Sequence, residues 1–288
     1  MIAMIVACMH LLFKKQFETP KETILRYIES GELPPKDTYT YAGRLDPLAS
    51  GVLVVLDETS VWRREEILSL PKTYEVEVLF GVSTDSFDLL GTVHPVQDVM
   101  TWHTLVPNFE IDTLHFDKKV IDEKLIPDKE VGSVKEYDWS KLKGSYTQYY
   151  PFFSSKPIDG IPLFEYSKIH GIGQTNEKLP TRIVEIYDIE KIEERIVSME
   201  DLEGQIEQVL SNVKGDFRQD EVKQSWEKYI ELSKNNTSKN RGYVVMKFRL
   251  NVSSGFYVRS FACWLGQKYG VGAIALSIKR TSVGEYTI

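Results

Sequence analysis

Residues 41–51 read YAGRLDPLASG and lead directly into the apolar run VLVVL at 52–56. A continuous apolar run bounded by glycine and by Asp57 predicts a strand that is buried on both faces. The polar loop before it delivers one carboxylate, that of Asp46, to the edge of the core. A plainer alternative is that Asp46 only begins a turn with Pro47, because Asp-Pro is common turn chemistry. The residues alone leave both interpretations open.

The amino-terminal part predicts a strand followed by a helix. The opening MIAMIVACM at 1–9 is apolar but lacks a basic leader, so we interpret it as a buried first strand and not as a signal peptide. It is also too short to span a bilayer before charge appears at Lys14. Thr19-Pro20-Lys21-Glu22 has the form of a capping box with proline at the first helical position, which predicts a helix to about Gly31.

Further strands and helices are indicated by periodicity. Apolar and polar residues alternate at 74–80, 181–189 and 246–252, which predicts three half-buried strands. A helix is expected over 257–268, ending near Gly270. Residues 95–148 show no clean period and suit a variable excursion from the sheet. Residues 198–232 have helical spacing and are followed by a polar connector, so we expect an inserted helical pair over 198–241.

Composition limits the class of protein. A chain of 288 residues with 42% hydrophobic residues can bury a sizeable core in one or two domains, which excludes wholesale disorder and a disulfide-stapled mini-protein. Cys8 and Cys263 are too few for a disulfide framework, so a cytoplasmic location is the simplest expectation. The five histidines show no metal-ligand spacing, and no phosphate-binding glycine motif or GxSxG elbow is present. We therefore expect no metal, no nucleotide cofactor and no membrane span.

Charge is distributed unevenly along the chain. The net charge of the whole chain is -7, which by itself argues against a nucleic-acid partner. Nine of the 35 basic residues, however, lie between Leu232 and Gly284, a stretch without Asp or Glu. This asymmetry predicts a polyanion-facing surface near the carboxyl end. Chance clustering on a solvated face is the alternative.

Four blocks of sequence, in order, resemble the TruB family of pseudouridine synthases. They are YAGRLDPLASG at 41–51; KTYEV at 72–76 with FGVSTDSFD at 80–88 and Gly91; FSSK at 153–156 with Gly160 and FEY at 164–166; and GFYVRS at 255–260 with LG at 265–266, GA at 272–273 and KRT at 279–281. The resemblance implies an α+β pseudouridine synthase fold, with a mixed, largely antiparallel sheet flanked by helices. It also implies a reaction that needs no cofactor.

The resemblance further assigns roles to residues. It implies that Asp46 is the nucleophile and that Arg259 is the cation that keeps this carboxylate charged, since an isolated buried carboxylate tends to protonate. Tyr74 matches a tyrosine that packs on the target uracil, and Tyr257 lines the same pocket. Candidate RNA contacts are Tyr41, Arg44, Lys72, Lys247, Arg249, Lys279 and Arg280.

Departures from the family pattern affect the expected target. Tyr41 stands where the family usually has histidine, and Arg44 replaces a small residue, as in the branches that act on ribosomal RNA. Only seven residues follow Thr281, so we expect a single catalytic domain over 1–288, a monomer, without the RNA-binding PUA domain of many relatives.

Three functions remain open from the sequence. The first is pseudouridine formation in RNA, with the T-loop of tRNA as the expected target and ribosomal RNA as the alternative. The second is an RNA-folding factor without catalysis. The third is a hydrolase that uses two carboxylates, such as Asp46 and Asp85, which would have to lie about 5–9.5 Å apart.

Overall fold

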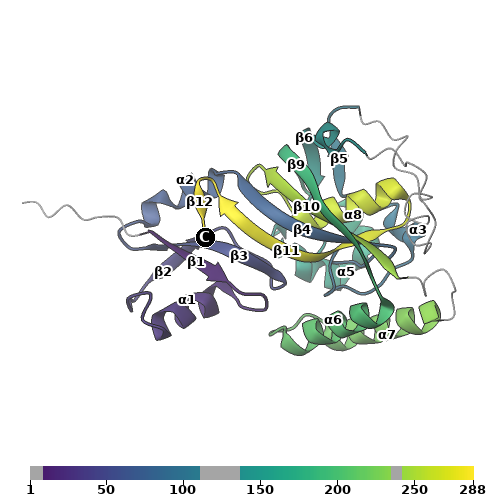
Figure 1. Cartoon of the computed structure of the whole chain (residues 1–288), viewed down its shortest axis with the longest axis horizontal. Helices are drawn as coiled ribbons and strands as arrows, with labels where there is room; N and C mark the ends of the chain where they lie inside the picture. The colour runs from purple at the N-terminus through teal and green to yellow at the C-terminus, as the bar shows by residue number, and fades with distance from the viewer. Residues whose placement is uncertain (1–8, 111–136, 235–241) are drawn as a thin grey trace, which may run out of the picture.

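The apolar run after Gly51 forms the central part of β3, whose side chains from Gly51 to Asp57 are all buried. The computed structural model describes residues 9–110, 137–234 and 242–288, and within them the chain folds into a large sheet with helices around it (Figure 1). The strands of this sheet are β1 (Met9–Lys14), β2 (Tyr39–Ala42), β3 (Ala49–Asp57), β4 (Lys72–Phe80), β5 (Leu105–Pro107), β6 (Gly144–Tyr149), β9 (Thr181–Val197), β10 (Tyr243–Val252), β11 (Ala273–Val283) and β12 (Tyr286–Thr287). A separate two-stranded ribbon consists of β7 (Pro157–Ile158) and β8 (Ile161–Pro162).

The helices are α1 (Pro20–Glu29), α2 (Arg64–Ser69), α3 (Val96–Val99), α5 (Leu163–Glu177), α6 (Met199–Asn212), α7 (Gln219–Lys234) and α8 (Val258–Tyr269), with short 3-10 turns at Val61–Arg63 and Trp139–Leu142. The strand order is β1-β3-β11-β4-β10-β9-β6-β5, with β2 paired to β3 and β12 to β11. The β3–β11 pair is parallel and the other pairs are antiparallel. The expected α+β class with a mixed, largely antiparallel sheet is therefore confirmed.

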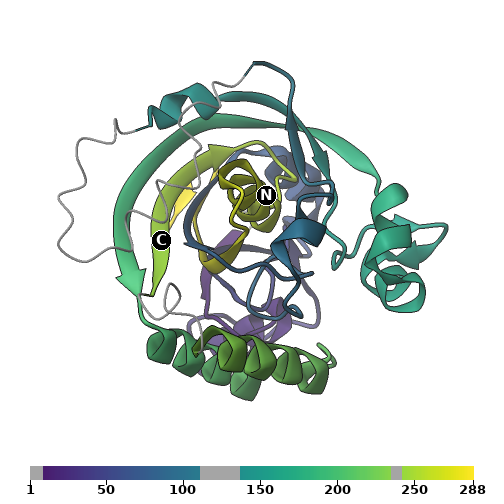
Figure 2. The same ribbon diagram turned by 90° about the vertical axis from the view of Figure 1, so that its right-hand side faces the viewer.

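The two faces of the sheet carry different cores. On one face, Val76 and Phe248 pack with Phe261 and Leu265 of α8, and the sheet curves around this helix (Figure 2). On the other face, alternate strand residues such as Leu79 and Val245 pack against α6 and α7. Because neighbouring residues of a strand point to opposite faces, both layers follow from the same strands.

Most elements lie where periodicity predicts them. Thr19 caps α1, and α8 ends at Gly270 in the left-handed conformation. The helical pair expected from 198 to 232 is α6 and α7. The strand predicted at 181–189 extends to Val197, and α5, which bends at Gly171, was not predicted. Residues 1–8 of the expected first strand, 111–136 of the excursion and the connector at 235–241 lie outside the described residues.

Candidate active site

Asp46 lies in the loop that connects β2 and β3, and these two strands form an antiparallel hairpin. The first two residues of the motif at 41–51 belong to β2, and the loop begins at Gly43. The neighbours of Asp46, Leu45 and Leu48, are buried and anchor the loop in the cores on either face. The backbone turns at Asp46, whose carbonyl accepts a hydrogen bond from the N–H of Ala49 at 3.0 Å. The turn chemistry expected of Asp-Pro is present, while the carboxylate itself remains 40% exposed.

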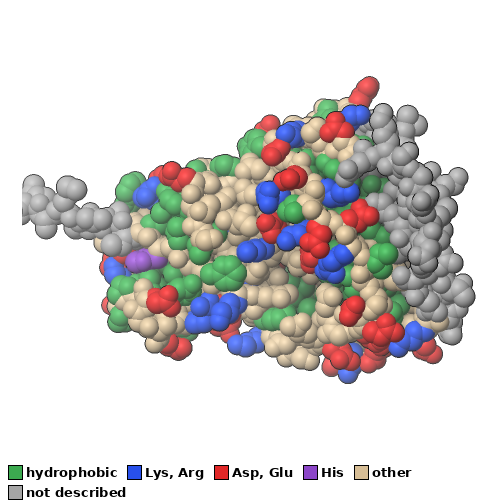
Figure 3. Space-filling model, in the orientation of Figure 1, with side chains coloured by type: hydrophobic (Ala, Val, Ile, Leu, Met, Phe, Trp, Pro, Cys, Tyr) green, Lys and Arg blue, Asp and Glu red, His purple; other side chains and the backbone are tan. Residues whose placement is uncertain are grey.

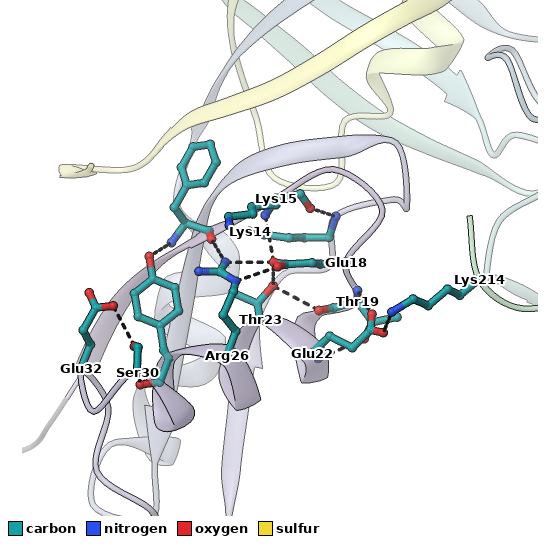
Figure 4. A network of polar contacts seen from close by, with 12 residues as sticks. Lys14, Lys15, Glu18, Thr19, Glu22, Thr23, Arg26, Ser30, Glu32 and Lys214 are labelled. Atoms are coloured by element: carbon teal, nitrogen blue, oxygen red, sulfur yellow. Dashed lines mark hydrogen bonds and ion pairs between the residues drawn. The ribbon is translucent and has the colours of Figure 1, made fainter. Parts of the chain in front are cut away.

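Two buried cations hold this loop from behind. Lys14, which is labelled in Figure 4, is fully buried. Its Nζ donates to the carbonyl oxygens of Ala49 at 2.6 Å and Asp46 at 3.2 Å. Arg280, 1% exposed, donates from Nε to Val52 O at 2.8 Å and from Nη2 to Gly43 O at 3.2 Å. Burial lowers the pKa of Lys14 to about 8. The backbone that carries Asp46 is therefore fixed by β1 and β11 together.

The expected ion pair between Asp46 and Arg259 is present. Arg259 lies in the first turn of α8, and its Nε donates to Asp46 Oδ2 at 2.7 Å. Its other nitrogens donate to the carbonyl oxygens of Ser86 at 2.7 Å and Phe153 at 3.2 Å. Burial opposes the charge on Arg259, but the carboxylates of Asp46 and Asp88 outweigh it and raise its pKa. The guanidinium is thus oriented by three separate segments and stays charged.

A second carboxylate, that of Asp88, lies behind Arg259. Its Oδ2 is 3.7 Å from Arg259 Nε, and its Oδ1 accepts hydrogen bonds from Ser86 Oγ and from the N–H of Leu90 at 2.9 Å. Burial raises the pKa of Asp88 above its ordinary value, although Arg259 acts in the opposite direction. Asp88 therefore adds a buried acceptor on the side of the guanidinium away from solvent.

Asp85, the second acid named for a hydrolase, is engaged elsewhere. It is 2% exposed and accepts two hydrogen bonds from Arg218, at 2.9 and 3.0 Å. Burial alone would raise the pKa of Asp85, but hydrogen bonds from His94 and Arg218 outweigh it and lower the pKa. A carboxylate buried in this pairing is not available to activate water, so the structure gives no support to the hydrolase.

The two tyrosines expected at the site lie on different elements, Tyr257 at the start of α8 and Tyr74 on β4. Tyr257 is the N-cap residue of α8, its N–H donates to Gln148 Oε1 at 3.0 Å, and its ring meets that of Tyr150 edge-on at 5.5 Å. Burial, and then Asp46, raise the pKa of Tyr257, so its hydroxyl remains protonated at neutral pH. Tyr74 is half-buried on the α8-facing side of β4 and packs against the same cluster as Leu45. The inward direction predicted for Tyr74 is confirmed.

Comparison with known proteins finds similarity over the part of the chain that carries Asp46. Residues 36–106 match the family described as "TruB family pseudouridylate synthase (N terminal domain)". The tRNA pseudouridine synthase B of Bacillus cytotoxicus is 26% identical over 248 residues, covering 86% of this chain and 57% of the relative. The enzymes of that name from Thermosipho melanesiensis and Aquifex aeolicus are 26% and 25% identical, covering 86% of this chain and 55% and 59% of theirs. The chain is thus similar to the TruB family over residues 36–106 and to these enzymes over most of its length.

The chain thus spans little more than half the length of these curated relatives. Among solved structures, a Cbf5-Nop10-Gar1 complex shares 16% identity with it, at a TM-score of 0.46 over 96% of this chain and 49% of the other. Within the described residues, no helix has the length and apolar character needed to cross a membrane. Nor do His, Cys, Asp or Glu side chains gather there in groups of three that could hold a metal ion.

Two of the expected RNA contacts are buried, which corrects their assignment. Within the described residues, the Arg280 guanidinium donates to the backbone oxygens of Val52 and Gly43, and to that of Arg44 at 3.5 Å. Lys72 is also buried, and its Nζ donates to the carbonyl oxygens of Leu68 and Leu70 at 2.6 Å, at the end of α2. Buried side chains that donate to backbone oxygens support the fold, which argues against a contact between either of them and a phosphate.

Three more of the expected contacts lie on the face of the sheet opposite α8. Lys247 pairs with Glu75 at 3.0 Å, and Arg249 pairs with Glu190 at 2.7 Å. Lys279 is exposed and lies beside Glu75 in the strand register. In Figure 3, basic and acidic side chains are intermingled over the strands in the middle of the view. These three residues of the basic block therefore lie beside glutamates on this face, whereas Arg259 of the same block pairs with Asp46.

Arg44 and Tyr41 lie close to Asp46 along the chain and differ in their surroundings. Arg44 is exposed, and its side chain makes no hydrogen bond or ion pair with the described residues. Tyr41 is half-buried and packs against the core beneath β2. Arg44 is thus a cation free to meet an anion beside the candidate nucleophile.

Sequence reasoning missed the residues that support the site from behind. These are Lys14, Ser86, Asp88, Gln148, Phe153 and Arg218. Asp88 was within a quoted block but received no role. Ser86 and Phe153 act through backbone carbonyls, which no side-chain pattern reveals.

Proposed function

We propose that this chain converts a uridine of RNA to pseudouridine, and that its substrate is the T-loop of tRNA. One observation carries the proposal: a half-exposed carboxylate, Asp46, stands on a rigid loop in a 2.7 Å ion pair with the buried Arg259. The names of the curated relatives, which are tRNA pseudouridine synthases, support the same reaction.

The geometry suits Asp46 to act as a nucleophile. Arg259 binds Oδ2, while Oδ1 receives no hydrogen bond from the described residues and faces no competing donor there. The ion pair favours the charged form of the carboxylate and fixes its direction. Attack by Oδ1 on an electron-poor carbon of the nucleotide assists breakage of the bond between C1′ and N1. The uracil then turns and rejoins C1′ through C5, and the bond to Asp46 Oδ1 breaks, which restores the carboxylate. C5 gives up its proton to a base and so to solvent, N1 gains a proton, and no oxidant or reductant is needed.

Two tyrosines complete the pocket in this proposal. A uridine must leave its stack to reach Asp46, at a cost of a few kcal/mol. Stacking on the ring of Tyr74 offsets this by roughly 1–3 kcal/mol per base, and its hydroxyl is our candidate to remove the C5 proton. Tyr257 keeps its own proton at neutral pH and therefore serves as a pocket wall.

Binding of RNA is proposed at the rim that carries Arg44. A free guanidinium beside the nucleophile suits a phosphate of the flipped nucleotide, and Tyr41 supports the strand beneath it. We place the reaction in the cytoplasm and expect a monomeric enzyme. Arg44 also keeps ribosomal RNA as the alternative substrate.

The proposal is tested by tritium release from RNA labelled at uridine C5. Wild type, Asp46→Asn and the control Asp37→Asn, which removes an exposed carboxylate outside the site, are incubated with transcribed tRNA and with ribosomal RNA fragments. We expect release from tRNA by wild type and Asp37→Asn and none by Asp46→Asn. Release from ribosomal fragments alone would move the substrate to ribosomal RNA. Tight binding without release from any RNA would refute catalysis and leave the RNA-folding factor.

A further inference from the structure

The connection between α6 and α7 brings a buried ion pair to the back of the site. Arg218, the residue before α7, has a φ of 58°, in the left-handed region that a non-glycine residue rarely adopts. In this conformation both Nη atoms meet the carboxylate of Asp85, at 2.9 and 3.0 Å. Asp85 also accepts hydrogen bonds from the N–H and the hydroxyl of Thr92, at 3.0 and 2.7 Å. The carboxylate is thus fully engaged and fixed in place.

Asp85 sets the position of the neighbouring carbonyl that holds Arg259. The carbonyl of Ser86, the next residue, accepts the 2.7 Å hydrogen bond from Arg259 Nη1. The loop is closely packed, since a Cβ placed on Gly91 would lie 2.7 Å from Asp85 Oδ1 and 2.5 Å from Ser86 Oγ. A shift of Asp85 therefore moves Ser86 and changes the direction of Arg259.

Arg218 is also linked to Arg259 through a second residue, Phe153. Its own guanidinium lies over the ring of Phe153, 4.1 Å from the centroid. The carbonyl of Phe153 accepts the hydrogen bond from Arg259 Nη2 at 3.2 Å. One side chain from the connection of the helical pair thus contacts Phe153 directly and reaches Ser86 through its neighbour Asp85.

The helical pair is attached to the same loop at further points. Ser225 Oγ accepts a hydrogen bond from the N–H of Val93 at 2.7 Å, and Trp226 Nε1 donates to Leu89 O at 3.3 Å. Leu89 and Leu90 also share a buried cluster with the apolar faces of α6 and α7. The pair therefore supports the whole segment from Asp85 to Val93 and not Arg218 alone.

We propose that Arg218 is a positioning residue that aligns Arg259, and through it Asp46, and that α6 and α7 form the brace that delivers it. This inference rests on the function proposed above. Arg218 contacts neither Asp46 nor the open side of the site, so it acts on the rate of the chemical step and not on RNA binding. Displacement of a reacting group by about 1 Å can lower a rate on the order of 10²-fold.

The test is a single-turnover tritium-release assay with four variants, combined with RNA binding and thermal unfolding. Arg218→Met removes the cation, and Arg218→Lys keeps the charge but loses the two-pronged contact. Asp85→Asn combined with Arg218→Met removes both charges, so no unpaired carboxylate remains buried. Lys214→Met is the control, because Lys214 lies on the same connection but pairs only with Glu22 of α1, at 2.7 Å (Figure 4).

We expect Arg218→Met to lower the single-turnover rate constant by about 10- to 100-fold, with RNA affinity unchanged within about threefold. Arg218→Lys should be intermediate and Lys214→Met unchanged. The double variant should regain thermal stability but not rate. If it regains both, or if Arg218→Met retains the wild-type rate, Arg218 only neutralises a buried charge and the inference is overturned. If Arg218→Met does not fold, the single-turnover rate of the double variant is the test: a lowered rate supports the inference, and a wild-type rate overturns it. A wild-type chain inactive on every RNA would instead refute the proposed function, and the inference with it.

Discussion

Replacement of Arg280 by methionine tests whether this arginine stabilises the fold or contacts RNA. From the sequence, Arg280 is predicted to contact a phosphate of RNA. In the structure its side chain is buried and donates hydrogen bonds to the carbonyl oxygens of Val52 and Gly43. Methionine fills similar space but donates no hydrogen bond. Each buried carbonyl left without a donor costs about 1–3 kcal/mol, and removal of a buried charge recovers part of that.

We therefore expect Arg280→Met to lower the free energy of unfolding by about 2–4 kcal/mol. For a chain of this size, that corresponds to a melting temperature lower by roughly 4–15 °C. The single-turnover rate should fall by about tenfold or more, since the loop of Asp46 loses its support from β11. The dependence of RNA affinity on salt should not change, because no phosphate contact is removed.

Arg44→Met is the matched control for this prediction. Arg44 is exposed and unpaired among the described residues, and its carbonyl lies next to the guanidinium of Arg280. We expect this variant to keep its melting temperature, while the slope of log affinity against log salt falls by about 0.7–0.9. Thermal unfolding and filter binding at several salt concentrations measure both quantities. A flatter salt slope with unchanged stability in Arg280→Met would refute the reasoning.

Three more predictions follow from the same geometry. Because the pKa of Lys14 falls from 10.5 to about 8 on folding, the unfolded chain binds its proton more tightly, so the free energy of unfolding should rise with pH between about 8 and 10.5, by at most about 3 kcal/mol. Urea unfolding of Lys14→Met should lack this rise; equal pH slopes in the two proteins would contradict the assignment. Tyr74→Phe keeps the ring and removes the hydroxyl, so RNA binding should be retained while the rate of tritium release falls by about 10²-fold or more; an unchanged rate would remove Tyr74 as the base. Lys247→Ala combined with Arg249→Ala should leave the salt slope of RNA binding unchanged, since both side chains pair with glutamates on the opposite face; a flatter slope would return them to the interface.

Periodicity predicted the strands and helices that carry the site because burial acts locally on them. The continuous apolar run of β3 indicates a strand buried on both faces, and the alternation in β4 indicates which of its residues point into the core. The capping box marks the start of α1. Arg259, which pairs with Asp46, lies 213 positions away along the chain, and only the family resemblance linked the two. Local patterns contain no information on such pairing.

The assignment of Lys279 and Arg280 to one surface fails for a reason present in the sequence. Adjacent residues of a strand point to opposite faces, so at most one of them could have met the same partner. In β11, Ile278 and Arg280 face inward and Lys279 faces outward. The acidic partners of Lys247 and Arg249 were beyond prediction, because the register of β10 against β4 and β9 depends on the completed sheet.

Buried cations that donate to backbone oxygens fix the loop that carries Asp46. Lys14 and Arg280 bind the carbonyls around Asp46, and Arg259 binds those of Ser86 and Phe153. A buried ammonium or guanidinium is costly to desolvate and is retained only where several acceptors surround it. Loss of any one leaves carbonyls unpaired in a different segment, so their effects should reach Asp46 by independent routes. Under the proposed function, the positive charge that attracts RNA comes from exposed side chains near Asp46, and Arg44 is our candidate.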